Sequence, residues 1–508
     1  MLSTRCSRFT LSLASLLFCL ATPGSAIARQ TPARLTLEDA IALAQRNNPE
    51  FLIQQNDEAE ADWAVREAYG ALLPSASIGG SISYDAAGEQ RLGVFSSADF
   101  GIGATPAYIS SGYSFGIGYR LSGDALFRVE QEKANRNATQ ARIQAAAFTL
   151  AADVTRQYLA AMAARDGVTL ARQELERATE NLRLAEARVA VGAAIALDAK
   201  QAEVERGRAE VALLRAENLL QTETLRLLEM IGLDMDREIE LASTFDVFEP
   251  TWSTDELVDM AMAGHPQLRA QRAQENAAKA AVRMARSQYL PTLDLSMRWN
   301  GYAQEVMDDD YLIRRYHEDV DARREQCENA NELVSRLNPP LPTEDCSLIT
   351  IDPAVEARIL EENNVFPFDF ARQPFAATLS ISLPIFNGFA RERRVEAAKV
   401  AADDARLRLR AEELRLKTEV ASAHATLRAA HRAVTLERRN RDLADEQLQL
   451  ARERYRVGAI TFVELTDAET RKSRADRDYL SAVYAFHEAL AALETAVGRD
   501  LRPRAGEG

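Results

Sequence analysis

The chain has 508 residues, of which 47% are apolar and 27% charged, and its formal net charge at neutral pH is −15. This length allows two or three domains, and the acidic charge argues against a nucleic-acid partner. Beyond the N-terminus no stretch is continuously apolar over about 18 residues, so the sequence predicts no transmembrane helix. Only strands could carry such a chain into a membrane.

The N-terminus has the three parts of a signal peptide. Arg5 and Arg8 precede an apolar run from Leu11 to Leu20, and small residues at Ala26 and Ala28 form a cleavage site. We therefore expect cleavage after Ala28 and export of the remaining chain from the cytoplasm.

Two pairs of short helices are expected, one pair in each half of the chain. Each pair begins at a capping box, which joins an N-cap hydroxyl to an acid three residues later. In each half the first helix stops at a proline, and the second helix runs on to a Leu-Pro pair. The residues concerned are Thr36, Asp39, Pro49 and Leu73-Pro74 in the first half, and Ser253, Glu256, Pro266 and Leu290-Pro291 in the second.

Four segments alternate apolar with polar or very small residues, as expected for strands with one apolar and one polar face. About ten residues each, they fit membrane-barrel strands that face lipid on one side and water on the other. A half-buried sheet in a soluble domain is the alternative. The apolar positions are Ala76, Ile78, Ile82 and Tyr84; Tyr113, Phe115, Ile117, Tyr119 and Leu121; Leu293, Leu295, Met297 and Trp299; and Phe375, Leu379, Ile381, Leu383 and Ile385.

The sequence is duplicated. Pro74 and Pro291 are separated by 217 positions, whereas Gly192 and Gly458 are separated by 266. The second copy therefore carries a longer insertion between its two strands. A period this long is outside the range of solenoid repeats, so we interpret it as one duplicated half-subunit.

The insertion, residues 303–374, is rich in acidic residues, Asn and Pro, and we expect a solvent-exposed loop with a short helix near 321–337. Its two cysteines, Cys327 and Cys346, are the only ones outside the signal peptide. In an oxidising compartment we expect them to form a disulfide, which stabilises the loop by about 3 kcal/mol. Unpaired thiols are the alternative.

Very long helices follow each pair of strands. Neither Gly nor Pro occurs from Phe389 to Val457 or from Ala459 to Val497, and only Gly458 separates these stretches. A helix from Phe389 to about Arg454 would span on the order of 100 Å. Apolar residues repeat in heptads, so we expect antiparallel coiled-coil hairpins that turn at Gly192 and Gly458. The heptad positions are Tyr479, Val483, Phe486, Leu490, Leu493 and Val497 in the second copy, and Leu213, Leu220 and Leu227 in the first.

Four strands cannot close a barrel, and an open sheet edge is not tolerated in lipid. The chain must therefore share its barrel with copies of itself. Two copies would give eight strands, and three would give twelve with room for a lumen. Two alternatives are an ordinary helical bundle and a periplasmic coiled-coil protein with an adaptor or structural role. Neither accounts for the strands.

These features resemble the TolC-like outer-membrane efflux and secretion channels, the outer membrane factors. The resemblance covers nearly the whole mature chain. The first half departs from the family pattern at its strand exit, which reads Leu121-Ser122-Gly123-Asp124. The motifs that carry the resemblance are a Leu-x-x-Ala helix start from Leu37 to Ala44, the two Leu-Pro pairs, the strand exit Leu383-Pro384-Ile385-Phe386-Asn387-Gly388, and Arg-x-x-Val-Gly at the hairpin tips.

The resemblance implies a mainly α fold with a transmembrane β-barrel. Three copies would share a twelve-stranded barrel in the outer membrane and a tunnel of twelve coiled-coil helices across the periplasm. Through a periplasmic adaptor protein the tunnel would dock with an inner-membrane pump. The chain would then serve as the exit duct of a tripartite efflux pump or a type I secretion system, and would expel small toxic compounds or proteins.

The resemblance also implies a gate at the hairpin tips. Family members close the periplasmic entrance with a tip tyrosine and line it with rings of acidic side chains. The matching residues here are Asp198, Tyr455, Glu464 and Asp467, with Tyr455 expected to reach Asp198. Ile460 replaces a basic residue that is frequent in the family. The tip turns, which would contact the adaptor, include Gly192, Gly458, Arg188 and Arg454.

No enzyme is expected. The five histidines are scattered, and His424 and His431 lie seven residues apart on one helical face, a pattern more typical of packed or solvated side chains than of a metal site. We therefore expect neither a metal nor a cofactor.

The expected domains follow the order of these elements. They are a signal peptide at 1–28, the first-half helices at 29–73, barrel hairpin 1 at 74–122, tunnel hairpin 1 at 123–232, a linker and the second-half helices at 233–290, barrel hairpin 2 at 291–387, tunnel hairpin 2 at 388–497 and a tail at 498–508.

Overall fold

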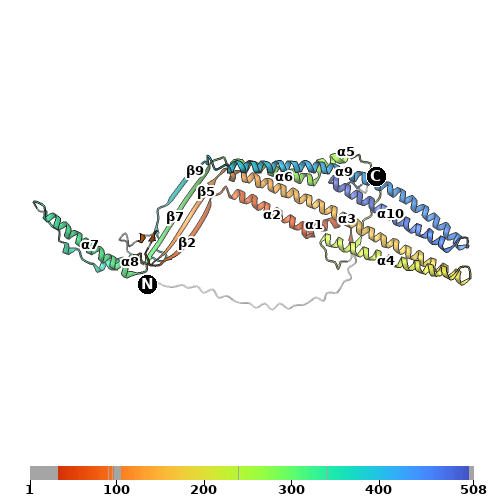
Figure 1. Cartoon of the computed structure of the whole chain (residues 1–508), viewed down its shortest axis with the longest axis horizontal. Coiled ribbons are helices and arrows are strands. Elements are labelled where there is room, and N and C mark those ends of the chain that lie inside the picture. The colour runs from red at the N-terminus through yellow and green to blue at the C-terminus, as the bar shows by residue number, and fades with distance from the viewer. Residues whose placement is uncertain are drawn as a thin grey trace, which may run out of the picture. The chain divides into compact units, whose positions relative to one another are not determined.

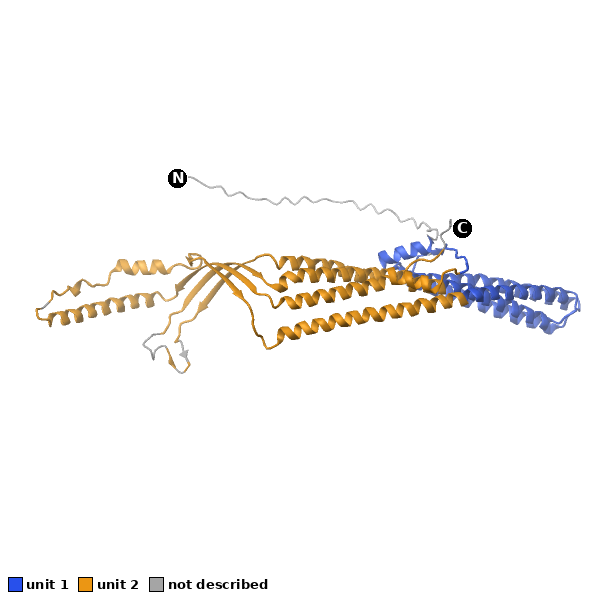
Figure 2. Ribbon diagram, turned by 90° about the horizontal axis from the view of Figure 1, so that it is seen from above, with its two compact units in different colours: residues 1–48, 153–249, 430–488 blue, residues 49–152, 250–429, 489–508 orange. Residues whose placement is uncertain are grey.

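The computed structural model describes residues 33–89, 91–93, 95–96, 104–237, 239–339 and 341–502 (Figure 1). The expected signal peptide and its cleavage site lie outside these residues. The chain divides into two compact units, each assembled from three separate stretches (Figure 2). One unit comprises residues 1–48, 153–249 and 430–488, and the other comprises residues 49–152, 250–429 and 489–508.

The second unit contains the predicted strands as one antiparallel sheet. Its order is β2 (Ser75–Asp85), β5 (Tyr108–Leu121), β7 (Thr292–Val306) and β9 (Ala376–Ser382), and the short β8 (Ala371–Arg372) also pairs with β7. A separate ribbon joins β3 (Arg91–Leu92) to β4 (Phe95–Ser96). The register pairs Phe115 with Trp299 and Arg120 with Asp294, so each predicted face continues from strand to strand.

The apolar face of the sheet is open. Ile78 on β2 is 85% exposed, and Leu379 and Ile381 on β9 are also exposed. Within the described residues, β2 pairs only with β5 and β9 only with β7, so the sheet has two free edges. An apolar face and open edges must be covered by something other than water.

The fourth strand is shorter than predicted. It ends at Ser382, so Leu383 and Ile385 lie beyond it. Pro384 has no N–H to donate to a strand ladder, which explains the early end. Arg391 stabilises the exit instead, because its guanidinium donates to the carbonyl oxygens of Pro384 (2.6 Å) and Ile385 (2.9 Å).

The short helices form as predicted. They are α1 (Leu37–Asn47), α2 (Pro49–Gly70), α5 (Thr254–Gly264) and α6 (Pro266–Ser287). Both capping boxes are complete: Asp39 N–H donates to Thr36 Oγ1 (3.2 Å), and Glu256 N–H donates to Ser253 Oγ (3.3 Å).

The four long helices also match the prediction, with α3 (Gly123–Ala190), α4 (Ala196–Ile231), α9 (Ala390–Arg456) and α10 (Phe462–Val497). The heptad residues Phe486, Leu490, Leu493 and Val497 are buried. Within the described ranges, none of the helices combines the length and apolar character that a membrane span requires.

The long insertion is more ordered than expected. We predicted an exposed loop from residue 303 with a short helix at 321–337. The insertion is largely exposed and helical in that region, but the predicted start of the loop and the predicted length of the helix are wrong. β7 continues to Val306, and a 27-residue helix, α7 (Asp309–Ser335), follows directly. Asp308 caps this helix by accepting from Tyr311 N–H (3.2 Å). The insertion continues with a short 3-10 helix η2 (Cys346–Leu348) and α8 (Pro353–Asn363).

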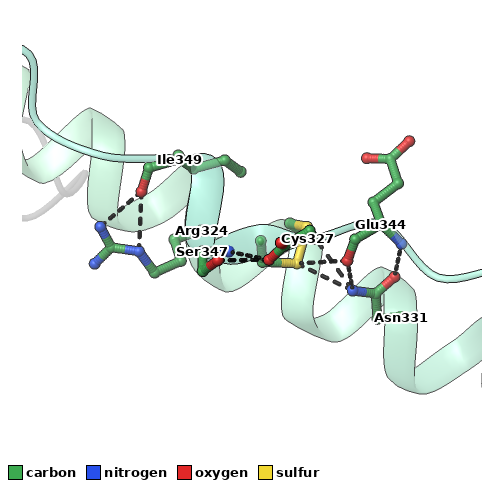
Figure 3. The surroundings of a disulfide bond; sticks show 8 residues. Arg324, Cys327, Asn331, Glu344, Ser347 and Ile349 are labelled. Atoms are coloured by element: carbon green, nitrogen blue, oxygen red, sulfur yellow. Dashed lines mark hydrogen bonds between the residues drawn. A yellow bond between two sulfur atoms is a disulfide. The ribbon is translucent and has the colours of Figure 1, made fainter.

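A disulfide holds this helical arm together. Cys327 on α7 is bonded to Cys346, with their Cα atoms 5.8 Å apart (Figure 3). Arg324 Nη2 donates to Ile349 O (2.7 Å). Asn331 Nδ2 donates to Glu344 O (2.7 Å), and Glu344 N–H donates back to Asn331 Oδ1 (2.9 Å).

The first unit is built around a small parallel pair of strands, β1 (Ala33–Leu35) and β6 (Ile239–Leu241). The buried Tyr158 donates its hydroxyl hydrogen to Leu35 O (2.8 Å) and accepts from Ser243 N–H (3.1 Å). Both hairpin turns belong to this unit.

Candidate functional site at the helix-hairpin tips

The two hairpin tips have the same backbone. In each, the glycine has a left-handed conformation, with φ of +72° at Gly192 and +77° at Gly458. Ala193 N–H donates to Arg188 O (2.8 Å), and Ala459 N–H donates to Arg454 O (2.8 Å). This pattern ends an α-helix with a residue free to adopt positive φ, and glycine does so without strain. The duplicated sequence therefore produces a duplicated turn.

Arg188 joins the two tips. Its guanidinium carbon lies 4.3 Å from the centroid of the Tyr455 ring, and the group donates to the carbonyl oxygens of Tyr455 and, at 3.1 Å, of Ala193. A Cβ at position 458 would lie 3.4 Å from Arg188 Nη2. Arg188 thus binds inside the chain, although the sequence suggested an adaptor contact.

Tyr455 is buried, with only 2% of its surface exposed. Its ring packs edge-on against Phe462 at a centroid distance of 5.8 Å. Among the described residues its hydroxyl has no hydrogen-bond partner. Burial raises the pKa of Tyr455, Asp198 raises it further, and Arg188 opposes both. We expected Tyr455 to reach Asp198; within the described residues the tyrosine hydroxyl makes no hydrogen bond to it, although the Asp198 charge contributes to the raised pKa.

An apolar cluster surrounds Tyr455 and draws on both hairpins. Four helices contribute to it, so the two tips share one small core. Its buried members are Leu182, Ala185, Ala202, Leu448, Tyr455, Phe462 and Leu465.

Glu464 caps α10. Its carboxylate accepts from Thr461 N–H (2.7 Å) and Thr461 Oγ1 (3.0 Å), and Glu464 N–H donates to Thr461 Oγ1 (3.3 Å). The bond from the Thr461 backbone, followed by that from its hydroxyl, holds the pKa of Glu464 below its usual range. The carboxylate is exposed and charged, and it also stabilises the helix N-terminus.

The other two acidic residues have different surroundings. Asp467 forms an ion pair with Arg471 on the next turn of α10 (2.8 Å). Asp198 lies in the first turn of α4, and within the described residues its carboxylate forms neither a hydrogen bond nor an ion pair. Of the three acids, Asp198 is thus the one whose carboxylate has neither a hydrogen-bond donor nor a cation as partner among the described residues.

Farther from the tips, charged side chains join the two helices of the second hairpin, α9 and α10. Lys472 is buried and pairs with Asp476 (2.7 Å) and Asp445 (3.3 Å). Arg452 pairs with Glu469 (3.0 Å). The Lys472–Asp476 pair, whose side chains are 11% and 12% exposed, is costly to break, because removal of one partner leaves the other charge uncompensated.

The rim of the tips is apolar and exposed. Arg454 is exposed there and offers its carbonyl oxygen only to the turn. Exposed apolar side chains gathered at one end of a soluble region mark a contact surface. They are Val191, Ile195 and Leu197 in the first hairpin, and Val457 and Val463 in the second.

The two histidines set aside in the sequence have separate partners. His424 Nδ1 hydrogen-bonds Thr254 Oγ1 (2.9 Å), and burial lowers the pKa of His424. The His431 ring lies 6.0 Å from the Phe486 ring. Their contacts are those of packed side chains.

Sequence reasoning missed the pairing of Arg188 with Tyr455 and the buried Lys472. No local pattern indicates the first, because that contact joins helices 267 residues apart in the chain. The sign of the second was a charged residue on the heptad seam of α10, since Lys472 lies seven residues before Tyr479 and four before Asp476.

A family model, described as outer membrane efflux protein, matches residues 40–233 and 361–499. No curated protein sequence matches the chain significantly. Among solved structures, the CmeC outer membrane channel of Campylobacter jejuni aligns with a TM-score of 0.67 at 14% identity, over 91% of this chain and 85% of that one.

Two further channels align over similar lengths. For the outer membrane protein VceC of Vibrio cholerae, the TM-score is 0.63 at 16% identity, over 92% of this chain and 97% of that one. For the open state of the MtrE outer membrane channel of Neisseria gonorrhoeae, it is 0.63 at 18% identity, over 92% and 89%. These matches confirm the predicted fold, and the family match favours a channel over a periplasmic adaptor. The chain belongs to the outer membrane efflux protein family.

Proposed function

We propose that three copies of this chain form one channel, with a shared barrel in the outer membrane and a helical tunnel in the periplasm. The channel is the exit duct of a tripartite efflux pump and expels small toxic compounds. A periplasmic adaptor and an inner-membrane pump complete the assembly, and the duct itself performs no chemistry. Membership of the outer membrane efflux family is the observation that carries this proposal.

The free edges of the sheet support the trimer. β2 exposes one edge and β9 the other, and both edges belong to strands with an apolar face. In a shared barrel, β2 of one copy pairs with β9 of the next, which satisfies the backbone groups that lipid cannot solvate. Three copies of four strands give twelve, enough for a lumen.

A groove along the tunnel helices supports the adaptor. It has a volume of about 560 Å³ and is floored by small residues of α3, including Ala160, Ala164 and Gly167. Ala212 and Ala216 of α4 line one wall, and Tyr484 of α10 lines the other. Apart from Leu170 and Glu174, the α3 residues that line the groove are alanine and glycine, which allows a helix of another protein to approach closely. We therefore assign the adaptor contact to this groove and to the apolar rim of the tips.

The tips form the gate. Three copies of Asp198, Glu464 and Asp467 surround the periplasmic entrance and favour cations there. The contact between Arg188 and Tyr455 fastens the second hairpin to the first and so sets the width of the entrance. Opening requires this contact to break or to move as one body with both tips.

The mass of the detergent-extracted protein tests the assembly. It should be measured by light scattering, with detergent subtracted, on protein recovered from separated inner and outer membranes. We expect a trimer in the outer-membrane fraction. A soluble monomer in the periplasmic fraction would contradict the shared barrel.

A further inference from the structure

We propose that residues Val365–Phe370, here called the aromatic strap, form a lipid-contacting anchor on the outer surface of the barrel. The strap connects α8 to β8 and carries three phenylalanines, Phe366, Phe368 and Phe370. The strap contacts the bilayer at the boundary between the lipid headgroups and the acyl chains. The inference rests on the proposed insertion of the strands into a membrane and adds a contact that the strands themselves do not supply.

The strap is fastened to the sheet at several points. Just before it, Asn363 closes a two-bond clamp on Val306: Val306 N–H donates to Asn363 Oδ1 (2.8 Å), and Asn363 Nδ2 donates to Val306 O (2.8 Å). Phe366 N–H donates to Glu305 Oε2 (3.0 Å). Ser111 Oγ donates to Pro367 O (2.6 Å). These bonds reach both β5 and β7, so the strap is a fixed part of the sheet surface.

The register shows which face the strap covers. Ser111 pairs with Ala303, and both belong to the same face as the pairs Phe115–Trp299 and Ile117–Met297. That is the apolar face. Ser111 and Ala303 are nevertheless buried. The strap therefore lies over the apolar side of the sheet and not over the side that lines the lumen.

Aromatic rings continue from the strands onto the strap. Phe115 lies 5.4 Å from Trp299, which lies 4.7 Å from Phe375. Tyr113 lies 5.0 Å from Phe370 on the strap, and Phe370 lies 6.4 Å from Phe368. Figure 1 shows β5 and β7 side by side in this sheet. The strap thus extends an apolar surface that already faces lipid.

The position of the Tyr113 ring depends on a glycine in the neighbouring strand. Its ring lies over Gly301, where a Cβ would come within 2.6 Å of Tyr113 Cε1. The glycine therefore leaves room for the ring that supports Phe370. At the outer end of the series, Phe368 is 80% exposed and has Asp369 beside it. A large apolar ring that is held rigidly in the open is unfavourable in water.

The height of the strap fits the membrane interface. From Leu121, where β5 meets the tunnel helix, to Ser111 is ten residues, or about 34 Å along the strand. A tilt of roughly 45° converts this to about 24 Å, which is close to the apolar band of barrels at about 25 Å. Ser111 and the strap therefore reach the far interface. Aromatic side chains favour this zone, and Asp369 can reach water there.

Quenching by brominated lipid tests the anchor in the full chain. Trp63, Trp252 and Trp299 are changed to Phe, and Phe368→Trp is introduced as the only tryptophan. The protein is reconstituted into phosphatidylcholine vesicles brominated near the glycerol end or near the methyl end of the acyl chains. We expect the Phe368→Trp protein to lose more than half of its emission in the first lipid and less in the second. Its conductance should match that of the parent.

Two controls make the result decisive. Leu348→Trp in the same background probes η2 of the arm, where Leu348 is 78% exposed, and should remain unquenched by lipid but accessible to iodide. A protein that retains only Trp299 reports insertion of the strands. If Trp299 is quenched and Phe368→Trp is not, the strap faces water or another copy of the chain. The proposed lipid anchor is then contradicted, whereas the proposed channel is not. If neither is quenched, both proposals fail.

Discussion

Arg188 holds Tyr455 by its ring and by its backbone carbonyl, across a separation of 267 residues. One side chain of the first hairpin thus fixes both the buried aromatic of the second hairpin and the end of its helix α9. Neither tip can shift relative to the other without loss of a charge-assisted hydrogen bond and a cation–π contact. The tips of one chain therefore behave as one body.

Replacement of Arg188 should loosen the entrance. Arg188→Ala removes the contacts to Tyr455 and Ala193, and we expect destabilisation of about 1–3 kcal/mol. Because the second hairpin is no longer fastened, single-channel conductance in a planar bilayer should rise. Arg183→Ala is the matched control, since Arg183 is 81% exposed and pairs only with Glu180 among the described residues. Equal conductance in both variants would show that the contact does not set the width of the entrance.

Glu464 carries two roles that different substitutions separate. Glu464→Gln keeps an acceptor for Thr461 N–H and removes the charge, whereas Glu464→Ala removes both. We expect the Gln variant to lower cation preference, read as a shift in reversal potential, with a smaller fall in melting temperature than the Ala variant. The Ala variant should lower both. If neither substitution moves the reversal potential, the acidic entrance ring has no part in ion selection.

Glu494 should make stability depend on pH. Burial raises its pKa to about 7, and this outweighs the opposing charge of Arg502 at 3.4 Å. The folded state therefore keeps a proton that the unfolded chain loses near pH 4.5. The free energy of unfolding is therefore highest below pH 4.5, and it falls by up to about 3 kcal/mol as the pH rises to about 7.

Glu494→Gln tests this dependence. Its amide oxygen can still accept from Leu501 N–H (3.1 Å in the parent), but the group does not ionise. In thermal unfolding between acid and neutral pH, the stability of the variant should depend less on pH than that of the parent. Above neutral pH the variant should be more stable than the parent. A slope identical to that of the parent would contradict the raised pKa.

The disulfide should protect the arm without affecting the channel. Cys327→Ser with Cys346→Ser opens a loop whose ends lie 19 residues apart, which costs the arm about 3 kcal/mol. We expect faster proteolysis within residues 309–363 and unchanged conductance. Asn331→Ala removes the two bonds to Glu344 and the contact of its amide with Cys346 Sγ (3.0 Å) but leaves the disulfide intact, and it should give a smaller increase in cleavage. Conductance that changes with the disulfide would show that the arm reaches the pore.

Local patterns in the sequence predicted the repeated elements well. Alternation located all four strands, because lipid on one side and water on the other demand opposite side chains at successive positions. Gly192 and Gly458 marked the turns because positive φ selects glycine. The last strand was predicted too long, since apolar alternation continues through Pro384 while hydrogen bonding does not.

Contacts between distant segments could not be predicted. Arg188 reads as a solvated helix residue until the second hairpin lies beside it. The aromatic strap falls in a segment rich in Pro and Asn, where alternation of Phe366, Phe368 and Phe370 was the only sign. Helix α7 was underestimated because its charged composition lacks an apolar stripe, and caps and the disulfide stabilise it instead.

Gly123 should be indispensable where α3 begins. A Cβ at this position would collide with Ser287 O, at the end of α6, and would lie 3.0 Å from Leu290 Cδ1. No side chain can occupy that space without moving one helix away from the other, so the position requires glycine. Gly123→Ala should therefore destabilise the protein by several kcal/mol or prevent folding.

Gly207→Ala in α4 is the matched control. Within the described residues nothing would lie within 4 Å of a Cβ added at this position, and alanine in a helix interior is favoured over glycine by about 0.5–1 kcal/mol. We expect this variant to unfold at a higher temperature than the parent and to yield as much protein in the outer membrane. If Gly123→Ala also folds with parental stability, the start of α3 does not approach the end of α6 closely enough to exclude a side chain at position 123.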